Sequence, residues 1–221
     1  QQFGFFFTTP ANASEVVLRI FNNAPGGCGN DLALDDITFR PCGPQLTPVI
    51  VGSTSTTATM CEGMTGSFTF SATVSAGFNN PSYQWQKSND GIVWADIPGA
   101  TTLNTTQTVP ATAATGNYLY RLSVAEAGNM NFSQCRIASN PLTVVVAPIP
   151  VATATSNSPV CQNSSLLLNA SGGSNYQWTG PNGFTATGSA VTISNVQPAQ
   201  AGRYYTEVTS PEGCKRSDSI D

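Results

Sequence analysis

Tyr83-Gln84-Trp85 and Tyr176-Gln177-Trp178 are two copies of one tripeptide, and the sequence around each copy repeats in the same order. A cysteine precedes each copy, a Gly-x-Tyr follows it, and a second cysteine comes after that tyrosine. The repeated residues are Cys61, Gly116, Tyr118 and Cys135 around the first copy, and Cys161, Gly202, Tyr204 and Cys214 around the second. A constellation that recurs in this way indicates a tandem of one domain type.

The composition favours strands over helices and excludes several functions. Charged residues make up 9% of the 221 residues, hydrophobic residues 40%, and the net charge is −4. β-branched and turn-forming residues are abundant, whereas Glu and Lys are scarce. Eight scattered basic residues cannot form the basic stripe that binds nucleic acid. No apolar run approaches the roughly 20 residues of a membrane helix, so we expect no membrane insertion.

Catalysis is not expected in this chain. Histidine is absent, which removes Ser-His-Asp and Cys-His nucleophile activation and histidine-ligated zinc. Adjacent Asp35 and Asp36 point to opposite faces of a strand, so they are a poor pair for glycoside hydrolysis. The sequence therefore predicts a protein that is not an enzyme.

Residues 46–147 are predicted to form one all-β sandwich, because short strands alternate with turn residues at near-regular spacing. The predicted strands are 47–51, 66–74, 82–88, 92–96, 105–109, 117–125 and 142–146. Residues 148–221 repeat the plan more compactly. Their predicted strands are 165–170, 175–179, 191–193, 202–209 and 215 onward, and we expect this domain to be truncated at its last strand.

Residues 1–45 contain three predicted strands, which bury too little surface to fold alone. The run Gly27-Cys28-Gly29-Asn30-Asp31-Leu32-Ala33-Leu34-Asp35-Asp36-Ile37-Thr38-Phe39 resembles the closing strands of MAM-like jelly-roll domains. The resemblance implies that residues 1–45 are the C-terminal strands of such a domain. It also implies binding to a cell-surface protein or a glycan.

The carboxylates of this first region have two interpretations. Asp35 shares a strand face with apolar residues, so its carboxylate must be paired, hydrogen-bonded or bound to a metal. One interpretation is a structural Ca²⁺ site made by Asp31, Asp35 and Asp36 with loop carbonyls. In the other, Asp35 caps backbone N–H groups and Asp36 is solvated. Cys28 and Cys42 flank this strand, and a disulfide between them would fasten the loop to the end of the domain.

The two repeated units resemble immunoglobulin-like modules, or closely related PKD-like modules, strung in tandem in large secreted and surface proteins of Bacteroidota. The resemblance implies that Trp85 and Trp178 fill the centres of two sandwiches. It also implies that Tyr118 and Tyr204 form tyrosine corners, in which the hydroxyl bonds back to the backbone.

The cysteines depart from the immunoglobulin pattern, in which the second cysteine lies two residues after the corner tyrosine. Tyr120 and Thr206 occupy those positions here. We therefore expect one disulfide near an end of each sandwich, or else unbridged cysteines or bonds to a neighbouring chain. The expected pairs are Cys61–Cys135 and Cys161–Cys214. Disulfides imply an oxidising, exported setting, so the protein is predicted to be secreted or on the cell surface.

The sequence thus predicts tandem immunoglobulin-like β-sandwiches after a partial jelly roll. Asp218-Ser219-Ile220 also resembles an O-glycosylation site of exported Bacteroidota proteins, which makes Ser219 a candidate site. We expect a structural or adhesive segment of a large exported surface protein or filament, in which disulfide-stapled modules act as spacers. Its partners would be other domains of the same chain, or further copies. The alternatives are an accessory region of a secreted multidomain enzyme, or glycan binding by the jelly roll.

Overall fold

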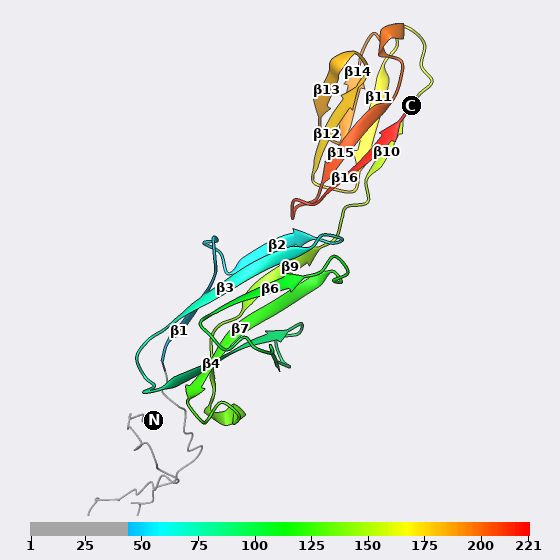
Figure 1. Ribbon diagram of the computed structural model, residues 1–221. Coiled ribbons are helices and arrows are strands. Elements are labelled where there is room, and N and C mark those ends of the chain that lie inside the picture. The colour runs from blue at the N-terminus through cyan, green and yellow to red at the C-terminus, as the bar shows by residue number, and fades with distance from the viewer. Residues whose placement is uncertain (1–43) are drawn as a thin grey trace, which may run out of the picture.

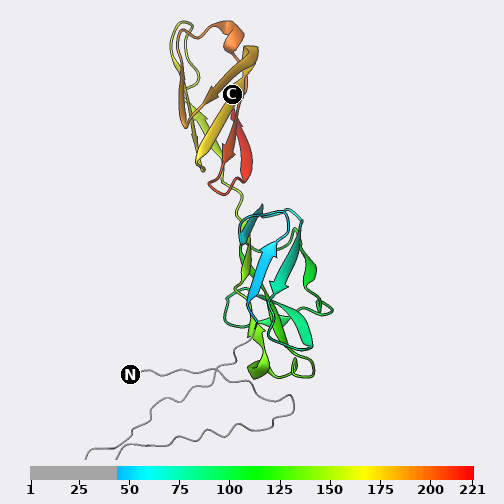
Figure 2. The same cartoon turned by 90° about the vertical axis from the view of Figure 1, so that its left-hand side faces the viewer.

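The computed structural model describes residues 44–221, which form two all-β sandwiches joined end to end (Figures 1 and 2). Several sequence predictions lie outside the described residues. They are the jelly-roll strands, the calcium ligands Asp31, Asp35 and Asp36, and the cysteines Cys28 and Cys42.

The first sandwich packs a three-stranded sheet against a six-stranded one. Its strands are β1 (Leu46–Ile50), β2 (Thr57–Cys61), β3 (Gly66–Val74), β4 (Pro81–Ser88), β5 (Ala95–Asp96), β6 (Asn104–Val109), β7 (Gly116–Glu126), β8 (Ile137–Ala138) and β9 (Leu142–Ala147), with a 3₁₀ turn η1 (Ser133–Cys135) after β7. The sheet orders are β1-β3-β6 and β2-β9-β7-β4-β5, and β8 pairs with β7. This is the pairing of an immunoglobulin sandwich, in which β3, β4, β6, β7 and β9 are strands B, C, E, F and G.

Six of the seven strands predicted here are observed, with boundaries that differ by at most one residue. The predicted strand 92–96 is reduced to β5. The reason is that the Asp90 carboxylate accepts hydrogen bonds from the N–H groups of Ile92 and Val93, at 2.8 and 2.9 Å, and holds them in a turn. Strand β2 was not predicted, and it runs parallel to β9 at the edge of the larger sheet.

An aromatic cluster forms the core of the first sandwich. Trp85 is fully buried, and its indole N–H donates to the carbonyl of Thr102 at 3.0 Å. Phe70 on β3 lies 6.0 Å from Trp85 and 4.6 Å from Tyr120, measured between ring centroids. Tyr120 stands at the position of the conventional second cysteine, so the two sheets are joined there by packed rings rather than by a disulfide.

The second sandwich repeats the plan with fewer residues. Its strands are β10 (Thr153–Ser156), β11 (Leu166–Ser171), β12 (Asn175–Gly180), β13 (Phe184–Thr187), β14 (Ala190–Ile193), β15 (Tyr204–Thr209) and β16 (Lys215–Ile220), with 3₁₀ turns η2 (Pro181–Gly183) and η3 (Pro198–Gln200). The sheet orders are β10-β11-β14 and β13-β12-β15-β16. Strands β10 and β13 were not predicted, whereas all five predicted strands are present.

The core of the second sandwich surrounds Trp178, which is buried and donates its indole N–H to the carbonyl of Gly188 at 3.1 Å. Thr206 stands at the position of the conventional second cysteine and is also fully buried. Its hydroxyl has no hydrogen-bond partner among the described residues. A buried hydroxyl without a partner costs stability, so this position is not optimised for packing.

Both predicted tyrosine corners are present. The hydroxyl of Tyr118 donates to the carbonyl of Ala114 at 3.0 Å, and that of Tyr204 donates to the carbonyl of Gln200 at 2.8 Å. In each case the acceptor lies four residues upstream, at the turn into strand F. The two sandwiches therefore share one module plan.

Candidate functional site: the junction between the sandwiches

A disulfide joins the two sandwiches. Cys61 is bonded to Cys214 at a sequence separation of 153, with 5.6 Å between the two Cα atoms. Cys135 and Cys161, which were the expected partners, are free and exposed. The expected disulfides within each sandwich are therefore wrong, and the observed one lies between modules.

The expected pairs fail because the two cysteines of a module lie at opposite ends of it. In the first sandwich Cys61 is beside Ala147, at the Gly116 end of β7, whereas Cys135 follows the Glu126 end. Strand β7 has 11 residues, so at about 3.3 Å per residue its ends lie more than about 30 Å apart. A disulfide requires Cα atoms within roughly 7 Å.

Strand β2 places Cys61 at the exit of the first sandwich. Cys61 is the last residue of β2 and lies opposite Ala147, the last residue of β9. The N–H of the next residue, Glu62, donates to the carbonyl of Ala147 at 2.8 Å. The chain leaves the first sandwich directly after Ala147, so the sulfur of Cys61 lies beside the start of the linker.

A tight turn between β15 and β16 places Cys214 at the entry of the second sandwich. The N–H of Ser210 donates to the carbonyl of Cys214 at 2.8 Å, and the N–H of Gly213 donates to the carbonyl of Ser210 at 3.0 Å. The N–H of Cys214 donates in turn to the hydroxyl of Ser210 at 3.2 Å. Cys214 is fully buried, whereas Cys61 is half-buried.

The linker itself has little freedom. Its residues 148–150 are Pro-Ile-Pro, and prolines fix the backbone angle φ. Pro150 is buried. Gly172, in the turn between β11 and β12, has φ +103°, and a Cβ atom there would overlap the carbonyl of Val151. The linker backbone therefore packs directly on the second sandwich at a place that accepts only glycine.

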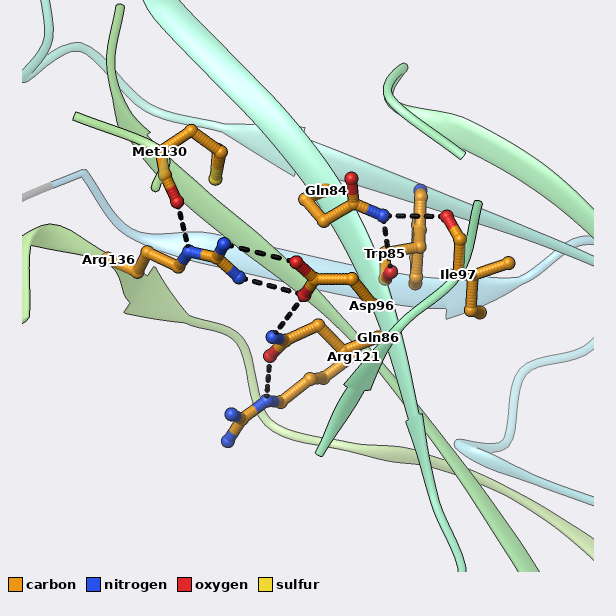
Figure 3. Close-up of polar contacts among 8 residues, drawn as sticks. All are labelled: Gln84, Trp85, Gln86, Asp96, Ile97, Arg121, Met130 and Arg136. Atoms are coloured by element: carbon orange, nitrogen blue, oxygen red, sulfur yellow. Dashed lines mark hydrogen bonds and ion pairs between the residues drawn. The ribbon is translucent and has the colours of Figure 1, made fainter. Parts of the chain in front are cut away.

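An ionic clamp holds the loop that carries Cys135 (Figure 3). Arg136, the residue after Cys135, donates from both terminal guanidinium nitrogens to the two carboxylate oxygens of Asp96, at 2.8 and 3.1 Å. Its Nε donates to the carbonyl of Met130. Gln86 donates its amide to the same carboxylate at 2.7 Å. The clamp fixes the position of the free thiol relative to the sheet.

Charge and burial perturb the groups around this clamp. Hydrogen bonds from Arg136 lower the pKa of the Asp96 carboxyl below its usual value. Arg121 donates to Gln86 at 2.8 Å, and its guanidinium lies 4.0 Å over the ring of Trp94. Burial lowers the pKa of Arg121 from its ordinary value, but the group stays charged at neutral pH. The cluster is a connected polar network, which suits holding a loop.

The loop that carries Cys161 is held in a comparable way. The side-chain amide of Gln162 donates to the side chain of Gln197 at 3.0 Å, and Gln197 donates to the side chain of Asn163 at 2.9 Å. Cys161 lies on the rim of a cavity of about 340 Å³. The apolar lining of this cavity includes Val160, Leu166, Leu168, Val196, Tyr204 and Ile220. The thiol is thus held on an ordered loop and is accessible.

Ser219, the candidate glycosylation site, lies within β16 opposite Tyr205 and is half-buried. The neighbouring Asp218 carboxylate accepts a hydrogen bond from the N–H of Ala154 at 2.8 Å. The motif is therefore part of a paired strand, and its glycosylation stays a prediction.

Within residues 44–221, no group of three or more His, Cys, Asp or Glu side chains is placed to hold a metal ion. Over the same residues no helix has the length and apolar character needed to cross a membrane.

One family model matches part of the chain. It is described as a domain of unknown function (DUF8696) and matches residues 50–148, which correspond to the first sandwich. No curated protein sequence matches the chain.

Solved structures that match this chain include immunoglobulin-domain proteins and a bacteriophage outer capsid protein. The amphioxus IgVJ-C2 molecule is 18% identical over 74% of this chain and 98% of its own, with a TM-score of 0.38. The DIP-gamma IG1+IG2 structure is 11% identical over 79% of this chain and 95% of its own, with a TM-score of 0.43. Three N-terminal domains of the bacteriophage RB49 highly immunogenic outer capsid protein (Hoc) are 18% identical over 80% of this chain and 57% of theirs, with a TM-score of 0.36.

Proposed function

We propose that this chain is a stiff two-module spacer of an exported surface protein or filament, and that it sets the distance and orientation between the parts on either side of it. The proposal rests on one observation, the Cys61–Cys214 disulfide between the sandwiches. A structural or adhesive role fits an immunoglobulin-like fold with such a bond. Disulfides persist mainly in oxidising compartments, which supports an extracellular location.

The geometry of the junction supports stiffness. A single linker would allow the two modules to bend and twist about it, since modules in one chain move relative to each other by default. Here a second covalent connection lies beside the linker, because Cys61 is opposite Ala147. Two adjacent connections restrict bending, and the packing of Gly172 on the linker backbone restricts twisting.

The two free thiols allow a direct test. Both are exposed, and each lies at the end of its sandwich away from the junction, Cys135 after the Glu126 end of β7 and Cys161 near Tyr204 and Asp221. Nitroxide labels on these two residues, in a Cys28→Ser, Cys42→Ser background, report the distance between the ends by pulsed electron resonance. We expect a narrow distance distribution in this background and a broad one after the further changes Cys61→Ser and Cys214→Ser.

A matched control separates bending from unfolding. Hydrogen exchange of the β7 and β15 amides should show that both sandwiches remain folded without the disulfide. Equally broad distributions with and without the bond would refute the proposal.

A further inference from the structure

The free cysteine of the second sandwich occupies the same place as Cys61 in the first. Each begins a four-residue turn that leads into strand B, closed by an N–H from the fourth residue to the cysteine carbonyl. These bonds run from Met64 to Cys61 at 3.3 Å and from Ser164 to Cys161 at 3.1 Å. The third residue of each turn has positive φ, 78° at Gly63 and 68° at Asn163.

The other two cysteines also occupy one place in the module plan. Cys135 and Cys214 both lie on the connection between strands F and G, just before the chain pairs with strand F again. The Cys61–Cys214 disulfide therefore joins the turn before strand B of the first sandwich to the F–G connection of the second.

The free thiols are the unpaired halves of the same arrangement. Cys161 lies in the turn before β11, near Tyr204 and Asp221 at the end of the second sandwich away from Cys214. Cys135 lies on the F–G connection after the Glu126 end of β7, away from the junction. Each is exposed and each sits on a loop held by side-chain hydrogen bonds. If a further module stacked on either end, the free thiol at that end would face a cysteine of that module, as Cys61 faces Cys214.

We propose that Cys161 forms a second junction disulfide, and that its partner is the F–G cysteine of another immunoglobulin-like module stacked on the far end of the second sandwich. The inference rests on the proposed function, and it names the partner and the bond by which the spacer is extended. The two modules described here then act as one repeat of a series in which every junction is closed in the same way.

The chemistry is thiol–disulfide exchange with a small disulfide oxidant, such as oxidised glutathione. The Cys161 thiolate attacks the oxidant and releases one thiol, which leaves a mixed disulfide on the protein. The partner thiolate then attacks the Cys161 sulfur and releases the second thiol. Two protein thiols are oxidised, one small disulfide is reduced to two thiols, and the two protons pass to the thiols released.

The strand register shows how to build the test. Tyr118 pairs with Val144 and the equivalent Tyr204 pairs with Ile220, so Asp221 corresponds to residue 145. Appending a second copy of residues 146–221 directly after Asp221 therefore reproduces the junction with its linker. The protein is refolded in a glutathione redox buffer, free thiols are alkylated, and the disulfides are mapped by peptide mass spectrometry.

We expect a bond between Cys161 of the parent chain and Cys214 of the appended copy. Alkylation of Cys161 should fall by roughly tenfold or more relative to an appended copy with Cys214→Ser, because stacked thiols meet at a high effective concentration. A second variant carries Cys214→Ser and Ser217→Cys in the appended copy, which keeps a tethered thiol but moves it. If stacking aligns the thiols, the moved cysteine should not bond to Cys161.

The parent Cys61–Cys214 bond is the internal reference. If it forms and Cys161 stays open to alkylation, or reacts equally with the moved cysteine, the inference is overturned and the proposed spacer stands. If the parent bond does not form either, both are overturned.

Discussion

Removing the Cys61–Cys214 disulfide should destabilise the second sandwich, although the bond does not cross that sandwich. When the second sandwich unfolds and the first stays folded, Cys61 remains fixed beside Ala147. The unfolded chain from Ala147 to Cys214, 67 residues away, is then a closed loop. The chain-entropy relation gives about 4 kcal/mol of stabilisation for a loop of that length.

The variant is Cys61→Ser with Cys214→Ser, measured by differential scanning calorimetry against the unmodified protein. A loss of about 4 kcal/mol corresponds to a fall of roughly 20 °C in the melting temperature of a domain of this size. Hydrogen exchange of the β15 amides, which pair with β12 and β16, assigns the transition to that module.

The matched control replaces the two exposed thiols, Cys135→Ser with Cys161→Ser. Because surface substitutions usually change stability by less than about 0.5 kcal/mol, this variant should melt like the parent protein. If the free energy of unfolding of the second sandwich falls by less than about 1 kcal/mol in the Cys61→Ser, Cys214→Ser variant, the bond does not restrain the unfolded second sandwich.

Three further changes test other features. Thr206→Val removes the buried hydroxyl that lacks a partner and should stabilise the second sandwich by about 1 kcal/mol in urea unfolding. The exposed control Thr187→Val should leave the stability unchanged. A destabilised Thr206→Val variant would show that the hydroxyl does have a partner. The folded-state pKa of Asp96 is lowered, so its carboxyl stabilises the first sandwich above the unfolded pKa near 4, and this contribution is lost as pH falls through the folded-state pKa. Asp96→Asn should therefore make the stability of the first sandwich depend less on pH in the acid range. The same pH dependence in both proteins, measured by acid unfolding, argues against the clamp. Gly172→Ala should lower the free energy of unfolding by about 1–3 kcal/mol and slow formation of the Cys61–Cys214 disulfide during refolding. The control Gly183→Ala, at a glycine that also has positive φ but open space around it, should form the disulfide at the normal rate. Equal rates in the two variants would contradict packing of the linker on the Gly172 turn.

The sequence predicted the module plan because that plan depends on local signals. The alternation of apolar residues and the turn signals located strands B, C, E, F and G of both sandwiches. The resemblance to immunoglobulin-like modules implied the core tryptophans and the tyrosine corners. Strand β2 was missed because Thr57–Cys61 is short and lies at the edge of the sheet, where it is held in place by pairing with β9.

The junction could not be predicted in the same way. A repeat of two cysteines in each module is compatible with pairing within modules or between them, and the choice depends on which end of the sandwich each cysteine occupies. That follows from the direction of the strands in three dimensions, which the spacing of Cys61 and Cys135 does not contain. The pair Gly172-Gly173 indicates only a turn in the sequence, and the fold alone shows that Gly172 meets the linker.

The position of the disulfide also determines how tension would pass through the molecule. Residue 44 and Asp221 lie at opposite ends of the unit (Figure 1). A pull between them would follow the chain to Cys61, cross the bond to Cys214 and leave through β16, so only the outer strands could be drawn out. The bond encloses a chain segment with a sequence separation of 153 residues. This segment would be about 540 Å long when fully extended, at roughly 3.5 Å per residue, and would carry none of the tension. Reduction of this one bond would turn the proposed spacer into a connector that can lengthen many-fold.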